Sequence, residues 1–179
     1  MTIDLSGIFA DNYRSGRHPD DEGNDAVTKE YTVCLDMDEF RSNAGNYKVL
    51  RKEPFILTVT RTGNMSAEIS GNTDIDLEIP CDRCLSPVKV TVMLTPDVDV
   101  DFEDKETSEF AEGFSVDIDK FLYPEIIMNL PMKTLCREDC RGICKKCGIN
   151  LNNGSCNCDT FVPDPRMSVI SDIFKQFNH

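Results

Sequence analysis

Eight of the nine cysteines in the 179-residue chain lie in four closely spaced pairs. Two pairs have the spacing Cys-x-x-Cys, and the others are separated by three residues and by one residue. Structural zinc takes four ligands, commonly thiolates from such short-spaced pairs. We therefore predict two zinc ions, each with four cysteine ligands. The eight predicted ligands are Cys81, Cys84, Cys136, Cys140, Cys144, Cys147, Cys156 and Cys158.

Four pairs can be divided between two sites in three ways, and the chain length between pairs favours one of them. Only eight residues, with an Asn-Gly turn among them, join Cys147 to Cys156. Closing so short a loop costs little entropy. We expect these last two pairs to form a self-contained ribbon. The first two pairs then form a site that joins the predicted sheet to the segment after the predicted helix.

Disulfide bonds are the alternative use of paired cysteines. Residues 1–6 include an acid and no basic segment, so they do not resemble a secretory signal. No run of residues approaches the 18 apolar positions typical of a membrane-spanning helix. We expect a cytoplasmic protein without membrane association, and in that reducing compartment thiols are available for metal.

The elements that must position the cysteines are mostly strands. Apolar and polar residues alternate in several segments joined by short turns, which predicts an antiparallel sheet with one solvated face. Between residues 73 and 79 the isoleucines and the leucine are predicted to face the core, and Asp74, Asp76 and Glu78 to face solvent. The alternating segments are 31–35, 55–60, 65–69, 73–79, 88–94 and 98–102.

The pattern places three of the cysteines, namely one pair and one single residue. The pair Cys81 and Cys84 falls in a turn between two predicted strands, with Pro80 before it and Pro87 after it. A Cys-x-x-Cys in such a turn is typical of a zinc knuckle, whose backbone amides stabilise thiolate charge. Cys34 lies on a predicted strand without a cysteine neighbour, so we interpret it as a spare thiol.

Helical periodicity is limited to two segments. Apolar residues recur at helical spacing after residue 117, but proline fits the first position of a helix and not its interior. We therefore predict a short turn at 117–122 and a helix at 124–130 that begins with Pro124. A second, amphipathic helix is predicted at 165–177, with its apolar face packed on the body of the protein.

The predicted fold class is α+β, an antiparallel β-sheet core with a short helix, a cysteine-rich zinc-ribbon segment and a C-terminal helix. Residues 38–46 are expected to form a helical turn or a loop, and residues 103–113 an acidic loop. The predicted domains are an antiparallel sheet domain with the knuckle and short helix at 1–132, the cysteine-rich segment at 133–163 and the C-terminal helix at 164–179.

Charge limits the partners of the chain. The sequence has 19 basic and 32 acidic side chains, a formal net charge of −13. Each zinc ion with four thiolates would add −2, which takes the total to roughly −17. Such a chain is a poor general binder of nucleic acid, whose phosphates demand cations. It suits a basic protein partner, for which the acidic residues from Asp97 to Glu112 are the candidate surface.

One region departs from this acidity. Between residues 133 and 147, five basic side chains stand against Glu138 and Asp139. These cations either contact nucleic acid or only offset the charge of the thiolates, and both interpretations stay open. The five basic residues are Lys133, Arg137, Arg141, Lys145 and Lys146.

An enzyme is the alternative class, either a thiol oxidoreductase or another zinc-dependent enzyme that uses the Cys-x-x-Cys motifs. Catalytic zinc keeps an open position, whereas the sulfurs here fill four positions twice. A redox Cys-x-x-Cys needs a βαβ setting, and these motifs lie in turn-rich or strand surroundings. The two histidines, His18 and His179, fall in segments expected to be mobile. We expect no enzymatic activity and no small-molecule substrate.

The order of motifs resembles the YceD-like family of bacteria and plastids, whose members are described as large ribosomal RNA subunit accumulation proteins. The resemblance covers roughly residues 50–175. It is carried by Cys81-Asp-Arg-Cys84-Leu85, by the Leu-Pro-Met that ends at Met132, by Leu135-Cys-Arg-Glu-Asp-Cys-Arg-Gly-Ile-Cys-Lys-Lys-Cys-Gly-Ile-Asn-Leu-Asn152, by the Cys-x-Cys that follows, and by Asp164-Pro165-Arg166.

The resemblance implies a non-catalytic role in the synthesis, processing or stability of 23S ribosomal RNA. With that role, we expect the partner to be a large-subunit ribosomal protein or a pre-ribosomal particle. Whether the basic residues also make a local rRNA contact or only balance the thiolates stays open. A transcription-related zinc ribbon is a third class. The family also implies a continuous helix before the cysteines, from which Pro124 departs.

Overall fold

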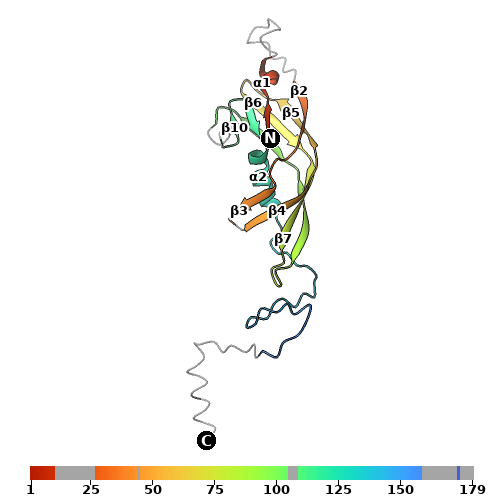
Figure 1. Cartoon of the computed structure of the whole chain (residues 1–179). Coiled ribbons are helices and arrows are strands. Elements are labelled where there is room, and N and C mark those ends of the chain that lie inside the picture. Colours follow the sequence, from red (N-terminus) through yellow and green to blue (C-terminus); the bar gives the residue numbers. More distant parts are fainter. Residues whose placement is uncertain (11–26, 44, 105–108, 159–172, 174–179) are drawn as a thin grey trace. The chain divides into compact units, whose positions relative to one another are not determined.

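The computed structural model describes residues 1–10, 27–43, 45–104, 109–158 and 173. The chain divides into two compact units. Unit 1 comprises Met1–Ile79 and Pro87–Thr134, and unit 2 comprises Pro80–Ser86 and Leu135–His179. The short insertion Pro80–Ser86 therefore groups with a segment that is distant in sequence. Figure 1 labels helices and strands of unit 1.

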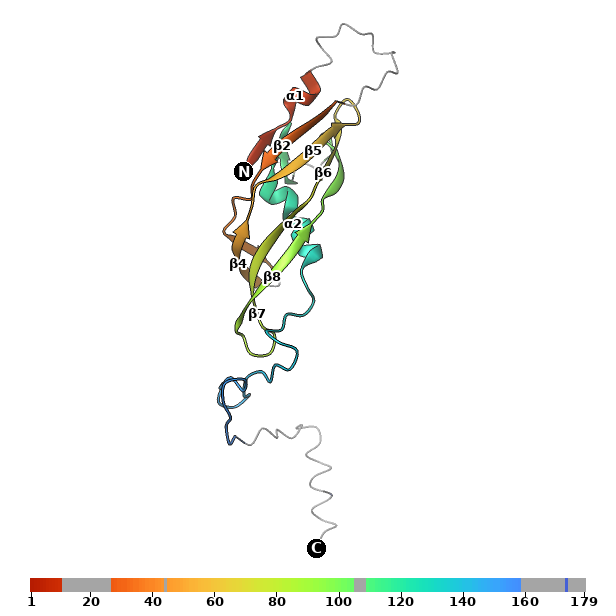
Figure 2. The ribbon, with the colours of Figure 1, turned by 90° about the vertical axis from the view of Figure 1, so that its right-hand side faces the viewer.

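Figure 2 shows that unit 1 consists mainly of strands. Its described residues form three sheets, with the strand orders β1-β11-β10, β2-β5-β6-β9 and β3-β4-β7-β8. The pairs of known register are antiparallel, as the alternation predicted. The strands are β1 (Thr2–Asp4), β2 (Thr28–Val33), β3 (Glu39–Ser42), β4 (Gly45–Lys52), β5 (Phe55–Arg61), β6 (Ser66–Gly71), β7 (Thr73–Pro80), β8 (Pro87–Leu94), β9 (Asp97–Asp101), β10 (Ala111–Glu112) and β11 (Ser115–Asp117), and the helices are α1 (Ser6–Phe9) and α2 (Ile118–Asn129).

The predicted single sheet is wrong, because β7 and β9 lie in different sheets although β8 alone separates them in the chain. The chain passes from one sheet to the other between β6 and β7, after Gly71, and returns between β8 and β9, at Pro96. The N–H of Gly71 donates to the carbonyl oxygen of Pro96 at 3.0 Å. A Cβ at Gly71 would lie 2.7 Å from a methyl carbon of Leu57. Leu57 lies opposite Gly71 on the neighbouring strand of the same sheet, so the absence of a side chain at Gly71 leaves room for the leucine.

The inward residues of the alternating segments form the core of unit 1. Leu57 and Val59 of β5, Ile69 of β6 and Leu77 of β7 have no exposed surface. Burying one such side chain stabilises the fold by about 1.5–3 kcal/mol. The core thus confirms the predicted inward face of these strands.

Helix α2 is one continuous helix with Pro124 in its interior, so the predicted break before Pro124 is wrong. Interior proline removes one backbone hydrogen bond and costs about 3 kcal/mol or more. The helix buries Phe121 and Leu122 before the proline and Ile126 after it. Their burial, at about 1.5–3 kcal/mol each, offsets that cost. The continuous helix is the one that the family resemblance implies.

Within residues 38–46, where a helical turn or loop was expected, Glu39–Ser42 form β3 and Gly45 begins β4. β3 pairs with β4, with Phe40 opposite Tyr47. Phe40 is buried and is the only large apolar residue of this segment, so no alternation was visible in the sequence. Its ring packs against Tyr123 of α2, with 5.1 Å between the centroids. The expected acidic loop at 103–113 likewise contains strand β10.

Asp76 was predicted to face solvent, but the structure buries it completely. Its carboxylate accepts hydrogen bonds from Arg51 Nε at 2.6 Å and Thr91 Oγ1 at 2.7 Å, and Lys89 Nζ lies 2.8 Å away. Arg51, then Lys89 and Thr91, hold the pKa of Asp76 well below its usual range. Long side chains of β4 and β8 therefore cover Asp76 on the outer face of β7.

Several predictions fall outside the described residues. The helix predicted at 165–177 is described only at residue 173 and stays a prediction. The division into three domains also stays a prediction. His18 and His179 are also outside. Among the described residues, none of the helices has the length and apolar character needed to span a bilayer.

Candidate metal centres

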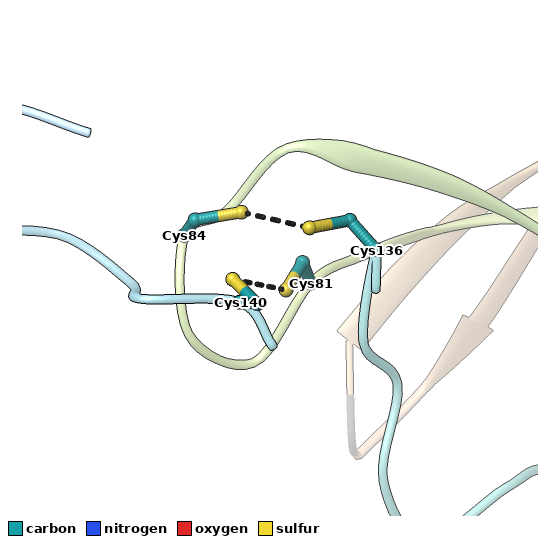
Figure 3. Close-up of side chains that lie close together, drawn as sticks. All are labelled: Cys81, Cys84, Cys136 and Cys140. Carbon is teal, nitrogen blue, oxygen red and sulfur yellow. Dashed lines mark hydrogen bonds between the residues drawn. The ribbon is translucent and has the colours of Figure 1, made fainter. Parts of the chain in front are cut away.

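The first cluster comprises Cys81, Cys84, Cys136 and Cys140, and its ligand atoms all lie within 4.8 Å of one another. Cys81 and Cys84 come from the β7–β8 loop, and the other two come from the segment that follows α2 (Figure 3). The sulfur of Cys81 lies 3.9 Å from that of Cys140, and the sulfur of Cys84 lies 3.5 Å from that of Cys136. Three of the four residues are buried, and Cys136 is exposed.

The second cluster comprises Cys144, Cys147, Cys156 and Cys158, again with all ligand atoms within 4.8 Å. Cys144 is buried, and the other three are partly or fully exposed. The structure therefore brings the four pairs together in the grouping that loop length favoured. The role of the eight cysteines as metal ligands stays a prediction.

The spacing of the sulfurs fits a tetrahedral metal site. Zinc–sulfur bonds of about 2.3 Å place the sulfurs of a tetrahedral site about 3.8 Å apart. A disulfide needs about 2.05 Å, and all nine cysteines are free thiols. Four thiolates are also the donor set that selects thiophilic ions over magnesium or calcium. Each cluster could thus hold one metal ion.

The two Cys-x-x-Cys loops have the same backbone hydrogen bonds. In the first loop, the N–H of Cys81 donates to Ser86 at 2.8 Å, and the N–H of Leu85 donates to Cys81 at 2.9 Å. In the second, the N–H of Cys144 donates to Ile149 at 2.9 Å, and the N–H of Gly148 donates to Cys144 at 2.9 Å. Both loops are therefore knuckles of one geometry.

The residue after each knuckle adopts a left-handed backbone conformation. Gly148 has φ +72°, which glycine adopts without strain. The equivalent residue of the first knuckle is Leu85, with φ +60°, where an ordinary side chain costs about 1–2 kcal/mol. The first knuckle therefore contains strain that the second avoids.

Backbone amides around the first cysteine of each knuckle favour the thiolate form. Burial raises the pKa of Cys81, but the N–H groups of Arg83, Cys136 and Cys84 lower it to about 6. In the second knuckle, the N–H groups of Cys147 and Lys146 lower the pKa of Cys144 to about 6.

In contrast, the pKa of one further thiol in each cluster is raised. Cys84 raises the pKa of Cys136 to about 12, and Cys147 raises the pKa of Cys158 to about 12. Four crowded thiols cannot all lose their protons without a nearby positive charge. A bound cation would remove this conflict, so the electrostatics of both clusters fit a metal ion.

The five predicted basic residues divide between the units. Lys133 belongs to unit 1, whereas Arg137, Arg141, Lys145 and Lys146 belong to unit 2 and are exposed. Arg137 forms an ion pair with Asp139, with Nε and Oδ1 3.3 Å apart. The exposed cations of unit 2 therefore lie on the same compact unit as both clusters.

Sequence reasoning missed three residues that contact the first cluster. Cys84 Sγ donates to Ser86 Oγ at 3.3 Å, and Asn152 Nδ2 donates to Cys140 Sγ at 3.3 Å. Arg83 Nη1 donates to the carbonyl oxygen of Cys140 at 2.8 Å. Ser86 and Arg83 adjoin the knuckle and could have been suspected, but no sequence signal linked Asn152 to this cluster. Cys34 belongs to neither cluster, as predicted.

Comparison with known proteins supports the resemblance noted in the sequence. A family model described as "Large ribosomal RNA subunit accumulation protein YceD" matches residues 69–174, a range that includes both clusters. Uncharacterized proteins of Mycobacterium bovis and of two strains of Mycobacterium tuberculosis are 30% identical over an alignment of 162 residues. The match covers 84% of this chain and 70% of each relative. No solved structure matches. Because the family model spans more than half of the chain and all eight paired cysteines, the protein belongs to the YceD family of large ribosomal RNA subunit accumulation proteins.

Proposed function

We propose that this protein is a non-catalytic, zinc-binding factor of ribosome biogenesis that acts in the synthesis, processing or stability of 23S rRNA of the large subunit. Family membership carries the proposal, because the family is described by its effect on large-subunit RNA accumulation. The geometry adds two thiol clusters of tetrahedral spacing, which support a metal-dependent fold in unit 2.

Zinc is the proposed metal at both clusters, one ion in each. It accepts four thiolates in a tetrahedral arrangement and has no redox chemistry. When bound, it supplies positive charge to the thiolates, and its binding free energy becomes folding free energy. The knuckle amides around Cys81 and Cys144 prepare the sulfurs for this charge.

The proposed role is structural and not catalytic. Four sulfurs close the coordination of each ion, whereas a catalytic zinc keeps a position open for water. A thiol oxidoreductase would place its reactive cysteine at the start of a helix. Cys81 lies instead between the strands β7 and β8, and Cys144 lies in a turn. Two retained zinc ions, with Cys34 as the only reactive thiol, would separate the structural role from the redox alternative.

The exposed cations of unit 2 are the proposed rRNA contact. Arg141, Lys145 and Lys146 lie within or beside the second knuckle, whose backbone the cluster holds in place. Cations on a fixed backbone can meet phosphates with little loss of conformational freedom. In unit 1, Asp97, Asp99 and Asp101 are exposed along β9. That acidic strand is the proposed contact for a basic large-subunit ribosomal protein within a pre-ribosomal particle.

Affinity capture from growing cells tests this function. A tagged full-length protein should co-purify precursors of the large subunit with their ribosomal proteins, and small-subunit precursors serve as the internal control. A variant with Cys84→Ser and Cys147→Ser should lose the association, because both clusters would be incomplete. Capture of neither precursor, or of both equally, would contradict a large-subunit role.

The protein is proposed to work in the cytoplasm, without association with a membrane and without a small-molecule ligand.

A further inference from the structure

We propose that the two clusters bind metal cooperatively, because Asn152, in the loop closed by the second cluster, positions Cys140 of the first. The inference rests on the proposed metal binding and not on the proposed rRNA role. It differs from the sequence-based expectation of a self-contained ribbon. Its physical basis is a set of contacts within unit 2 between the loop at 148–155 and the first cluster.

Asn152 lies between Cys147 and Cys156 in the chain, yet its side chain contacts the first cluster. Its Nδ2 donates to Cys140 Sγ at 3.3 Å. Its Oδ1 accepts from the backbone N–H of Arg141 at 2.8 Å and from Arg137 Nη2 at 3.0 Å. Two donors face the oxygen, so the amide orientation that points nitrogen at the sulfur satisfies every contact.

A second path joins the same loop to Cys84. Asn150 Nδ2 donates to Ser86 Oγ at 3.4 Å, and the same Oγ accepts from Cys84 Sγ at 3.3 Å. Asn150 Oδ1 accepts from the backbone N–H of Asn152 at 2.9 Å. The two asparagines thus fix each other and reach one cysteine from each pair of the first cluster.

The backbone provides a third connection. Arg83 of the first knuckle accepts from the N–H of Ile143 at 3.1 Å, and Gly142 accepts from the N–H of Leu151 at 2.9 Å. Gly142 has φ +78°, and a Cβ there would lie 2.9 Å from the carbonyl oxygen of Arg83. The chain therefore passes against the first knuckle where it enters the second cluster.

These contacts predict positive coupling between the two ions. A metal in the second cluster orders the loop at 148–155, and the ordered loop presents Asn152 to Cys140. Partners of a metal ligand that lie outside the coordination sphere change metal affinity about 10–100-fold when removed. Coupling between two binding sites is reciprocal, so a metal in the first cluster must favour the second by the same factor.

The test compares zinc affinities in full-length proteins by competition with a chelator. One variant, Cys144→Ser with Cys147→Ser, retains only the first cluster. Another, Cys81→Ser with Cys84→Ser, retains only the second. The overall constant for binding two zinc ions to the wild type should exceed the product of the two single-cluster constants by about 10–100-fold. Equality of the two quantities would overturn the proposal, as would a wild type that holds fewer than two ions.

Asn152→Ala separates positioning from general damage, because it keeps all eight cysteines. In the protein with both clusters, it should remove most of the amount by which the overall zinc-binding constant exceeds the product of the single-cluster constants. In the variant that retains only the first cluster, it should leave the zinc affinity unchanged, since the loop at 148–155 is already released in that variant. Asn153→Ala in the same loop is the matched control, because Asn153 is exposed and contacts Asn150 through its backbone N–H. An excess that survives Asn152→Ala, or an equal loss in Asn153→Ala, would overturn the role of Asn152.

Discussion

The sulfurs of Cys84 and Cys136 lie 3.5 Å apart although the two residues are 52 positions apart in the chain. Strands β8 and β9 and helix α2 all fall within that interval. A metal ion in the first cluster would therefore close a long loop, whereas one in the second cluster would join Cys147 to Cys156, which are only nine positions apart. The two clusters have the same kind of ligand, four cysteines each, but they differ in how far apart in the chain those cysteines lie.

Loss of the first cluster should destabilise the protein more than loss of the second. The entropy of closing 52 residues exceeds that of closing nine by about 1.5 kcal/mol. Cys84→Ser should therefore lower the stability of the strands well beyond Cys147→Ser, which should mainly release the segment from Cys144 to Cys158. Urea unfolding followed by far-ultraviolet circular dichroism measures the difference. Equal losses in the two variants would contradict the assigned roles.

Leu85→Gly should stabilise the first knuckle. It removes the strain of a leucine in a left-handed backbone conformation, which stabilises the folded state by about 1–2 kcal/mol. About half of this gain is lost because glycine makes the unfolded chain more flexible. The side chain of Leu85 is 64% exposed, so little burial is lost. The expected gain is about 0.5–1 kcal/mol in thermal unfolding of the zinc-loaded protein.

Gly148→Leu is the matched reverse change in the second knuckle. It should weaken zinc retention, because it introduces the strain that Leu85 carries at φ +60°. If Leu85→Gly weakens zinc retention instead, the side chain of Leu85 has a role that backbone strain does not explain.

Asp76→Asn should reduce stability at neutral pH, and the stability of this variant should change less with pH below about pH 4. Because the pKa of Asp76 is lowered on folding, its contribution is full above the unfolded value of about 3.9 and is lost as pH falls through the folded value. The wild type should therefore lose stability below about pH 4 more steeply than the variant. Thermal unfolding across this range measures both slopes.

Asp74→Asn is the control, because Asp74 also pairs with Arg51 but is 44% exposed. It should lower the melting temperature less than Asp76→Asn. Parallel pH curves for the wild type and Asp76→Asn would contradict the role assigned to the buried carboxylate.

The sequence predicted those parts of the fold that repeat a pattern. Strands with several inward residues, such as Leu57 and Val59, were visible because burial selects alternating apolar positions. β3 was missed because Phe40 alone anchors it, and one buried ring makes no pattern. Asp76 was placed outside for the opposite reason, since it follows the alternation, and its burial depends on Arg51, Lys89 and Thr91 from neighbouring strands.

The sequence was sufficient to predict which cysteines come together, but not which residues surround them. The spacing of the cysteines and the short interval after Cys147 were sufficient for the two groups. The contact from Asn152 to Cys140 was not visible, because an asparagine in a glycine-containing loop is usually a turn residue. The continuous helix through Pro124 also depended on tertiary burial, which local preference does not include.

Removal of the exposed cations should weaken rRNA association. Changing Arg141, Lys145 and Lys146 to alanine should lower binding to large-subunit precursors, and the salt dependence of binding should fall by about one unit per lost phosphate contact. The affinity difference from wild type should shrink as salt rises. Captured precursor RNA at several salt concentrations provides the measurement.

A triple variant of the exposed unit 1 cations Arg41, Lys48 and Lys120 removes the same charge and should bind normally. If the unit 2 variant binds precursors normally but retains zinc less tightly, these cations only balance the thiolates. The acidic residues of β9 would then be the better candidate for the partner surface.

Metal content tests the central claim most directly, since every structural role above requires that the two clusters hold ions. Native mass spectrometry of the full-length protein, purified under reducing conditions without added metal, should give two zinc ions per chain. Cys84→Ser and Cys147→Ser should each reduce the number to about one, because each leaves one complete set of four thiolates. A wild-type protein that carries one zinc ion or none, with its paired thiols reduced, would contradict the account.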